Sequence, residues 1–231
     1  MGAPLNQLGV VHRNIQRADP AAVEKLSHLS VATIHEAMGR DGLMRPYMRS
    51  VWHGAKLCGT AVTVLLQPGD NWMLHVAAEQ IKPGDVVVAG CTDESTGGFF
   101  GDLLATSYKA RGARGLIIDG GVRDVDTLEE MGFPVFSRVV HARGTIKASL
   151  GSVNIPVVCA GAIVNPGDVV VADADGVVVV PAAAAAEVAA KAQAREDNEA
   201  KKREIFASGV LGLDYYKMRE GLEKAGLKYI D

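Results

Sequence analysis

The sequence has few aromatic residues, few cysteines and no long apolar run. Aromatic side chains make up only 5% of the 231 residues although apolar residues make up 48%, so valine, alanine, leucine and isoleucine must fill the core. No apolar run approaches the ~20 residues that a membrane-spanning helix needs. The 24 basic residues nearly balance the 27 acidic ones, which gives no reason to expect a nucleic acid or an anionic membrane as a partner.

The cysteines and the first residues narrow the possibilities further. Cys58, Cys91 and Cys159 are widely spaced and lie in or beside apolar segments, so we expect buried thiols rather than disulfides or zinc ligands. The opening Met-Gly-Ala-Pro-Leu-Asn has neither the features of a signal peptide nor the serine or threonine that myristoylation requires. We therefore expect a cytoplasmic protein.

The apolar pattern predicts an α/β protein with a central β core flanked by helices. Continuous valine and isoleucine runs indicate strands covered on both faces, at about 57–65, 85–89, 115–119, 135–137, 156–159, 169–172 and 176–180. Helical spacing and capping residues predict helices at about 20–29, 31–39, 71–81, 102–111 and 125–131.

One heptapeptide occurs twice. Pro-Gly-Asp-Val-Val-Val-Ala is found at 83–89 and again at 166–172. Each copy reads as a Pro-Gly turn that leads into a buried strand. We interpret the pair as two similar corners of one layered sheet system rather than as a functional repeat.

The last fifty residues differ in composition from the rest. A long helix rich in alanine and charge is predicted from 182 to about 207, and a shorter one follows near 213–224. Pairs such as Glu199 and Arg203, four residues apart, stabilise a solvated helix. We therefore divide the chain into an α/β core, 1–181, and a helical extension, 182–231. A helix this weakly amphipathic packs poorly on its own core, so we expect it to contact a neighbouring subunit.

The most informative stretch runs from Gly97 to Asp124. A glycine-rich loop, Gly97-Gly-Phe-Phe-Gly101, leads into a helix that starts at Asp102. The unpaired N–H groups of a helix start can bind a carboxylate or a phosphate. A plain glycine-rich turn is the alternative, because no Gly-Lys-Ser/Thr of a P-loop follows.

Charged residues follow the next predicted strand. The strand 115–119 runs into Gly-Gly-Val, and then Arg123 and Asp124, and ligands of α/β sheets gather where strands end and helices begin. Arg123 is suited to hold a carboxylate or enolate oxygen, and Asp124 a hard divalent cation. Taken singly, Asp102 and Asp124 could each simply cap a helix.

The spacing of these residues resembles a known family. Asp102, twenty intervening residues and then Arg123-Asp124 are similar to the signature of class II pyruvate aldolases that act on 4-hydroxy-4-methyl-2-oxoglutarate or 4-carboxy-4-hydroxy-2-oxoadipate. These enzymes belong with the regulator of ribonuclease activity A-like family. The segments 31–37, 83–88 and 143–147 resemble the family as well. The fold that the resemblance implies is a layered αββα sandwich of the swivelling β/β/α type, assembled as a trimer or hexamer.

The resemblance also implies roles for particular residues. Asp124 would bind Mg²⁺ or Mn²⁺ directly and Asp102 would do so through water, a sparse oxygen shell that suits magnesium. A glutamate of the adjacent subunit, Glu199 or alternatively Glu196, would reach the waters of the metal. The pyruvate carboxylate would lie at the helix start formed by Gly101, Leu103 and Leu104, and Arg123 would contact the pyruvyl oxygens.

The activity implied is a metal-dependent retro-aldol cleavage. Cleaving a 4-hydroxy-2-oxoacid leaves a pyruvate enolate, which the metal and Arg123 would stabilise, while a water oriented by Asp102 would accept the C4 hydroxyl proton. The same charge stabilisation would decarboxylate oxaloacetate as a side activity. The alternatives are a non-enzymatic binding protein like the ribonuclease regulators, and a dedicated oxaloacetate decarboxylase.

Other polar residues have weaker claims. His35 and Glu36 fit a helix surface better than a substrate contact. His75 and His141 are lone histidines, for which core or surface positions are expected. Lys147 could meet a distal carboxylate, or serve as a Schiff-base lysine in a metal-free mechanism.

Overall fold

The computed structural model describes residues 7–231, so the opening residues on which the expectation of no leader rests lie outside the described part. The chain forms two compact units, one up to Ala192 and one from Gln193 to Asp231. The first unit extends past residue 181 because Ala185, Val188, Ala189 and Ala192 are buried in its core.

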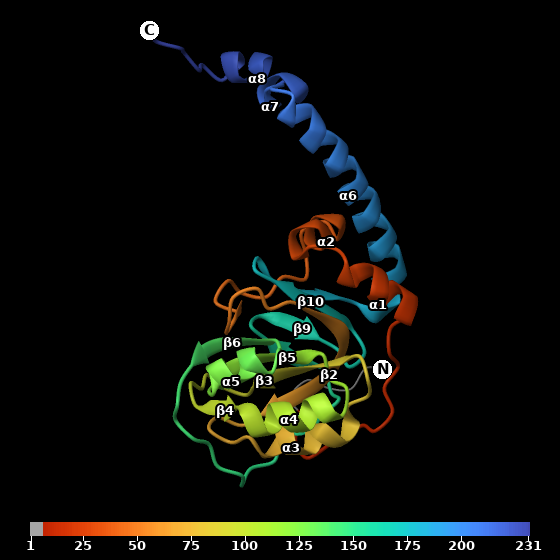
Figure 1. The fold of residues 1–231 in the computed structure, drawn as a ribbon, viewed down its shortest axis with the longest axis vertical. Helices are drawn as coiled ribbons and strands as arrows, with labels where there is room; N and C mark the ends of the chain where they lie inside the picture. Colours follow the sequence, from red (N-terminus) through yellow and green to blue (C-terminus); the bar gives the residue numbers. More distant parts are fainter. Residues whose placement is uncertain (1–6) are drawn as a thin grey trace. The chain divides into compact units, whose positions relative to one another are not determined.

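The first unit is built on one large mixed sheet (Figure 1). Its central strands β2 (Leu57–Leu66), β3 (Asp85–Cys91), β5 (Gly115–Val122) and β6 (Val135–Val140) are parallel to one another. Antiparallel strands extend both sides. β1 (Arg49–Ser50) pairs with β6, and on the other side β10 (Val169–Asp173) pairs with β2 and β11 (Gly176–Val180) pairs with β10. Two short strands pair at the side, β4 (Gly98–Phe100) with β5 and β7 (Ser152–Val153) with β2.

The two outer edges of this sheet approach each other. The Arg49 guanidinium at β1 donates a hydrogen bond of 2.9 Å to the carbonyl oxygen of Asp175, in the turn between β10 and β11. Leu43, just before β1, forms a β-bridge with Val178 of β11. The sheet is therefore nearly closed, which leaves an interior face and an exterior face.

Helices cover the exterior face in two groups (Figure 1). One group contains α3 (Trp72–Ala77), α4 (Asp102–Ala110) and α5 (Val125–Glu130), which bury Leu74, Leu104 and Leu128 against β2, β3 and β5. The other contains α1 (Pro20–Ser27) and α2 (Val31–Ala37), which pack with the start of α6 on β10 and β11. The interior is filled by valine, isoleucine and methionine side chains and by the hairpin β8–β9 (Val157–Cys159 and Ala162–Val164).

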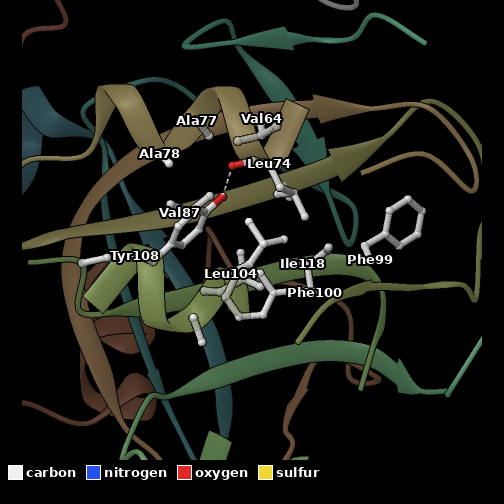
Figure 2. Close-up of a cluster of buried hydrophobic side chains, with 14 of the residues drawn as sticks. Val64, Leu74, Ala77, Ala78, Val87, Phe99, Phe100, Leu104, Tyr108 and Ile118 are labelled. Carbon is white, nitrogen blue, oxygen red and sulfur yellow. Dashed lines mark hydrogen bonds between the residues drawn. The ribbon is translucent and has the colours of Figure 1, made fainter. Parts of the chain in front are cut away.

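The core beneath α4 fixes that helix in place. Figure 2 shows Leu104 and Tyr108 of α4 directed toward the sheet, beside Phe100 and Ile118. The Tyr108 hydroxyl is fully buried and donates a hydrogen bond of 2.8 Å to the carbonyl oxygen of Leu74 in α3. The start of α4 is thus held by packing against its neighbours on both sides.

The duplicated heptapeptide forms two corners of this sheet, as expected. The strands that follow the two copies, β3 and β10, lie on opposite sides of β2, where Thr60 pairs with both Asp85 and Val169. In each copy the aspartate accepts a hydrogen bond from the backbone nitrogen three residues earlier, Asp85 from Lys82 at 2.7 Å and Asp168 from Asn165 at 2.8 Å. Both aspartates are buried and stabilise a turn.

The second unit is helical. It holds the end of α6 (Ala185–Ala207), followed by α7 (Gly212–Tyr215) and α8 (Arg219–Lys224). The single helix expected at 213–224 is interrupted at Lys217, whose backbone is left-handed with φ 53°. The rings of Phe206, Tyr215 and Tyr216 contact one another. None of the helices within residues 7–231 has the length and apolarity that crossing a membrane requires.

Several expected elements have different limits in the structure. The residues Gly98–Phe100, expected to be a loop, form β4, because Gly98 and Phe100 pair with Gly121 and Val122 at the end of β5. The helix expected at 71–81 becomes 3-10 helical over Ala78–Gln80. The strand expected at 156–159 belongs to a separate two-stranded sheet.

Candidate active site

Two strand-to-helix connections lie side by side at one edge of the sheet. β4 leads into α4, and β5 leads into α5, and the two strands are parallel neighbours. The Arg123 backbone nitrogen donates a hydrogen bond of 2.9 Å to the carbonyl oxygen of Phe100. Because the strands run together and end together, the starts of both helices face the same space.

The two aspartates of these connections meet across this space. The Asp124 carboxylate oxygen Oδ2 accepts a hydrogen bond from the Asp102 backbone nitrogen at 3.3 Å. Asp124 occupies the N-cap position of α5, but its side chain makes no capping bond to that helix. The capping alternative is therefore wrong for Asp124 at its own helix, and Asp102 lies one residue inside α4, after Gly101.

Backbone geometry at two residues makes this approach possible. A Cβ atom on Gly101 would lie 2.1 Å from Asp124 Oδ2, so only glycine admits the carboxylate here. Asp124 itself adopts a left-handed backbone, φ 58° and ψ 37°. For a residue with a side chain this conformation costs about 1–2 kcal/mol, and such strain is found mainly at functional positions.

Arg123 lies beside this pair. Its Nε atom is 3.5 Å from Asp124 Oδ2, and its side chain is 47% exposed, which leaves most of the guanidinium free to bind a ligand. A Cβ atom on Gly98 would contact the Arg123 side chain at 3.4 Å and the carbonyl oxygen of His141 at 2.6 Å. The stem of Arg123 therefore lies in a narrow passage between β4 and the segment that follows β6.

These residues line one cavity of about 150 Å³. Gly101, Asp102, Leu103, Leu104, Arg123 and Asp124 all contribute to it, so every core residue that the sequence indicates as a site residue is brought together. The rest of the lining consists of Asn71, His75, Gly98, Phe99, Gly144, Thr145 and Lys147. His75, expected in the core or on the surface, is an exposed residue that lines this cavity.

The start of α4 provides backbone donors to the cavity. Its first turn has N–H groups without helical partners, and the Leu103 N–H donates to the Asp102 carboxylate at 2.8 Å. Leu103 is 79% exposed, whereas Leu104 is buried in the core shown in Figure 2. The exposed leucine adds an apolar surface to the mouth of the cavity.

Asn71 and His75 extend the polar lining along α3. The Asn71 side-chain nitrogen donates a hydrogen bond of 2.8 Å to the carbonyl oxygen of Phe99. The Oδ1 atom of Asn71 has no hydrogen-bond partner among the described residues. The pKa of His75 lies below its ordinary value because partial burial disfavours the charged ring and because Lys147 carries a positive charge nearby. His75 is therefore a neutral ring at neutral pH.

The ligand set of the cavity suits a hard divalent cation. Within residues 7–231 no group of three or more histidine, cysteine, aspartate or glutamate side chains is arranged to hold a metal, which does not match a zinc site. Magnesium binds through one or two carboxylates and several waters. Asp102 and Asp124, brought together by the absence of a Cβ at Gly101, fit that requirement.

The remaining candidates have partners elsewhere. His35 Nδ1 lies 2.9 Å from the carbonyl oxygen of Asp41, and Glu36 pairs with Arg40 at 3.1 Å, as expected for a helix surface. His141 is an exposed loop residue. Glu199 and Glu196 belong to the second compact unit, where they pair with Arg203 at 3.7 Å and 3.0 Å.

The prediction of buried thiols is confirmed for two of the three cysteines, whereas Cys91 is only partly buried. All three are free thiols, and Cys58 and Cys159 are buried. Burial raises the pKa of Cys58 to about 12 and raises that of Cys159 as well. Uncharged thiols are poor nucleophiles and poor metal ligands, so none of them contributes to this site.

Comparison with known proteins adds a family and several relatives. A family model described as RraA-like, aldolase/RraA, matches residues 31–179. A provisionally named 4-hydroxy-4-methyl-2-oxoglutarate aldolase of Halalkalibacterium halodurans is 34% identical over 151 residues, which are 65% of this chain and 72% of the relative.

Two solved structures have the same fold. An uncharacterised protein from Pseudomonas syringae pv. tomato superposes with a TM-score of 0.78 at 31% identity, over 88% of this chain and 95% of the other. Streptomyces coelicolor RraAS2 is described as an unusual member of the RNase ES inhibitor RraA protein family. It has a TM-score of 0.74 at 30% identity, over 82% of this chain and 99% of the other. Of these three relatives, one is named as an aldolase, one as a ribonuclease inhibitor family member, and one is uncharacterised.

Proposed function

Because this chain belongs to the RraA-like family, we propose that it is the aldolase rather than the regulator form of that fold. The observation that carries the proposal is the meeting of Asp102, Arg123 and Asp124 on one cavity. The left-handed backbone of Asp124 and the glycine that admits its carboxylate support a site built to hold a ligand, since such strain clusters at active sites and ligand clamps. The relative from Halalkalibacterium halodurans, named as an aldolase, supports the same conclusion.

The reaction is the retro-aldol cleavage of a 4-hydroxy-2-oxoacid. The substrates are 4-hydroxy-4-methyl-2-oxoglutarate, which gives two pyruvates, and 4-carboxy-4-hydroxy-2-oxoadipate, which gives pyruvate and oxaloacetate. The C3–C4 bond breaks, its electron pair passes to the C2 oxygen as a pyruvate enolate, and the C4 hydroxyl proton must be removed. A proton added at C3 then completes pyruvate.

The side chains of the cavity divide this work. Asp124 would hold Mg²⁺ or Mn²⁺ directly and Asp102 through water, and the bound ion supplies Lewis-acid stabilisation of negative charge. The Arg123 guanidinium holds the developing charge on the C2 oxygen. The N–H groups at the start of α4 that have no partner within the helix, including those of Leu103 and Leu104, would hold the C1 carboxylate.

Substrate binding would also free the carboxylate of Asp102, the group proposed to position the water that acts as the base. The Leu103 N–H donates to Asp102 Oδ1 at 2.8 Å, and a substrate carboxylate at the same N–H would replace Asp102 as the acceptor. The Asp102 carboxylate would then orient a water that accepts the C4 hydroxyl proton. The same enolate stabilisation would release carbon dioxide from oxaloacetate, as a side activity.

The experiment is a pyruvate-release assay on both substrates and on oxaloacetate, with and without a chelator. Chelation should abolish release and added Mg²⁺ or Mn²⁺ should restore it. The variant Asp124→Ala should lose about 100-fold or more in kcat/KM. Glu130→Ala, which removes an exposed acid at the end of α5 that lines neither cavity containing Asp124, should retain full activity. Full release in excess chelator, or from Asp124→Ala, would contradict the metal-dependent mechanism. No release from the parent protein in the presence of metal would support the regulator form instead.

A further inference from the structure

The cavity contains a positively charged side chain, that of Lys147, which the proposed chemistry does not use. Lys147 belongs to the segment between β6 and β7 and lines the same cavity as Arg123 and Asp124. This segment lies beside β4. The Gly98 backbone nitrogen donates a hydrogen bond of 2.7 Å to the carbonyl oxygen of Arg143, four residues before Lys147. Lys147 therefore lines the cavity from a segment other than the two helix starts.

A buried carboxylate holds this segment in position. Asp70, 2% exposed, accepts hydrogen bonds through Oδ2 from the backbone nitrogens of Ala148 at 2.7 Å and Ser149 at 2.6 Å. Its Oδ1 accepts from the Trp72 nitrogen at 2.8 Å, at the start of α3. One charged group thus joins the two residues after Lys147 to the helix that carries His75.

The residue before Lys147 is anchored as well. The Ile146 backbone nitrogen donates 2.9 Å to the carbonyl oxygen of Gly69, and its carbonyl oxygen accepts 3.1 Å from the Asn71 nitrogen. Although burial alone would raise the pKa of Asp70, the hydrogen bonds from Trp72, Ala148 and Ser149 hold that pKa below its ordinary value. The Asp70 carboxylate is therefore ionised at neutral pH, and its hydrogen bonds are strongest in that state.

The charges of the cavity indicate what Lys147 is for. The lining contains two carboxylates, Asp102 and Asp124, and two fixed cations, Arg123 and Lys147, so its side chains sum to zero. His75 adds no charge, because its pKa is lowered by burial and by Lys147. A divalent cation held by the aspartates leaves a net charge of about +2, which a ligand with two carboxylates neutralises.

We propose that Lys147 binds the second carboxylate of a dicarboxylate substrate, with Asp70 as the residue that positions it. The first carboxylate occupies the start of α4, and the second faces the segment 143–149. This inference rests on the proposed function and assigns a residue to the C4 carboxylate that both proposed substrates carry. Aldols with an uncharged C4 substituent lack the group that Lys147 recognises.

The test compares two ligands that the enzyme cannot cleave by a retro-aldol reaction. Pyruvate has one carboxylate, and 2-oxoglutarate has the same 2-oxo group and a second carboxylate. Binding of each to the full-length protein with Mg²⁺ is measured by calorimetry. Lys147→Gln should weaken the binding of 2-oxoglutarate about tenfold or more, as expected for the loss of a charge-assisted hydrogen bond. The affinity for pyruvate should change by about twofold or less.

Matched variants separate the role of the charge from that of the fold. Lys147→Arg should retain most of the preference for 2-oxoglutarate, and Lys56→Gln, at an exposed lysine that does not line the cavity, should change neither ligand. Asp70→Asn should reduce the same preference and also speed amide hydrogen exchange at Ala148 and Ser149. That exchange measures the hydrogen bonds of Ala148 and Ser149 to Asp70 independently of ligand binding.

The outcomes distinguish this inference from the function on which it rests. An equal loss of both ligands in Lys147→Gln, or no loss of either, overturns the role of Lys147 while pyruvate binding by the parent protein remains. A parent protein that binds neither ligand in the presence of metal overturns the aldolase proposal, and this inference with it.

Discussion

Asp124 Oδ2 accepts a hydrogen bond of 3.3 Å from the backbone nitrogen of Asp102, so the carboxylate of one helix start lies at the first peptide of the other. This contact joins the ends of two neighbouring parallel strands, β4 and β5. It brings two acids into one cavity and leaves Arg123 beside them. Four predictions follow from this contact and from the residues around it.

The approach of Asp124 depends on the absence of a side chain at Gly101. In Gly101→Ala the new methyl group would lie 2.1 Å from Asp124 Oδ2, so the carboxylate must move away from α4. Misplacement by about 1 Å at a reacting centre costs about 100-fold in rate, and we expect a loss of that order in kcat/KM. Gly221→Ala is the control, since a Cβ there meets nothing within 4 Å. Equal activity of the two variants would contradict the role given to Gly101.

Adjacent leucines at the start of α4 should differ in their effect on stability. Leu104 is buried among the side chains of Figure 2, whereas Leu103 is 79% exposed. We expect Leu104→Ala to lower the free energy of unfolding by about 2–5 kcal/mol. Leu103→Ala should change it by about 0.5 kcal/mol or less. Denaturant unfolding measures both, and similar values for the two would show that the burial of α4 is different from that described.

The ring of His75 should titrate below its ordinary pKa. Burial disfavours its charged form and Lys147 repels it, so the folded protein binds the proton less readily than the unfolded chain. The contribution to stability is complete above the ordinary value of 6.5 and is lost as the pH falls below it. An NMR titration of Lys147→Gln should show the His75 pKa shifted upward. A His75 pKa that does not change would mean that Lys147 lies too far away to act on it.

The glutamate of the helical extension is tested by mixing subunits. If Glu199 acts at the site of an adjacent copy, inactive Asp124→Ala chains and inactive Glu199→Ala chains should recover part of the pyruvate release when combined in one oligomer. The same mixture with Glu196→Ala tests the alternative glutamate. Asp124→Ala mixed with Arg123→Ala is the control, because both changes affect the same cavity. Absence of recovery from both glutamate mixtures would argue against a shared site.

Much of the site was accessible to prediction because it depends on local sequence. Arg123 and Asp124 follow a strand of strong apolar character, and Gly101 and Asp102 begin a helix with clear spacing. Such patterns place residues at strand ends, and ends of parallel strands meet at one edge. The three-residue strand β4 was missed, because its pairing with β5 is a long-range contact that leaves no periodic pattern in so short a segment.

The other side of the cavity was accessible only in part, since the sequence indicated Lys147 as a residue to meet a distal carboxylate but did not place it beside His75. His75 and Lys147 lie in segments far apart in the chain, and they share a cavity because Asp70 bonds to both segments. The bond from Asp70 to the Trp72 nitrogen is a local capping signal that the sequence offered. The bonds to Ala148 and Ser149 had no such signal, since a carboxylate that serves distant backbone groups resembles any other aspartate in sequence.

The parallel pairing of β4 with β5 also bears on how such a protein changes over generations. The three residues proposed to carry the chemistry lie in one uninterrupted stretch of the gene, between codons 102 and 124, while the core beneath depends on residues elsewhere as well. A few codon changes in that stretch would remove the activity and leave a folded descendant free to acquire another role. One scaffold can in this way supply both enzymes and regulators.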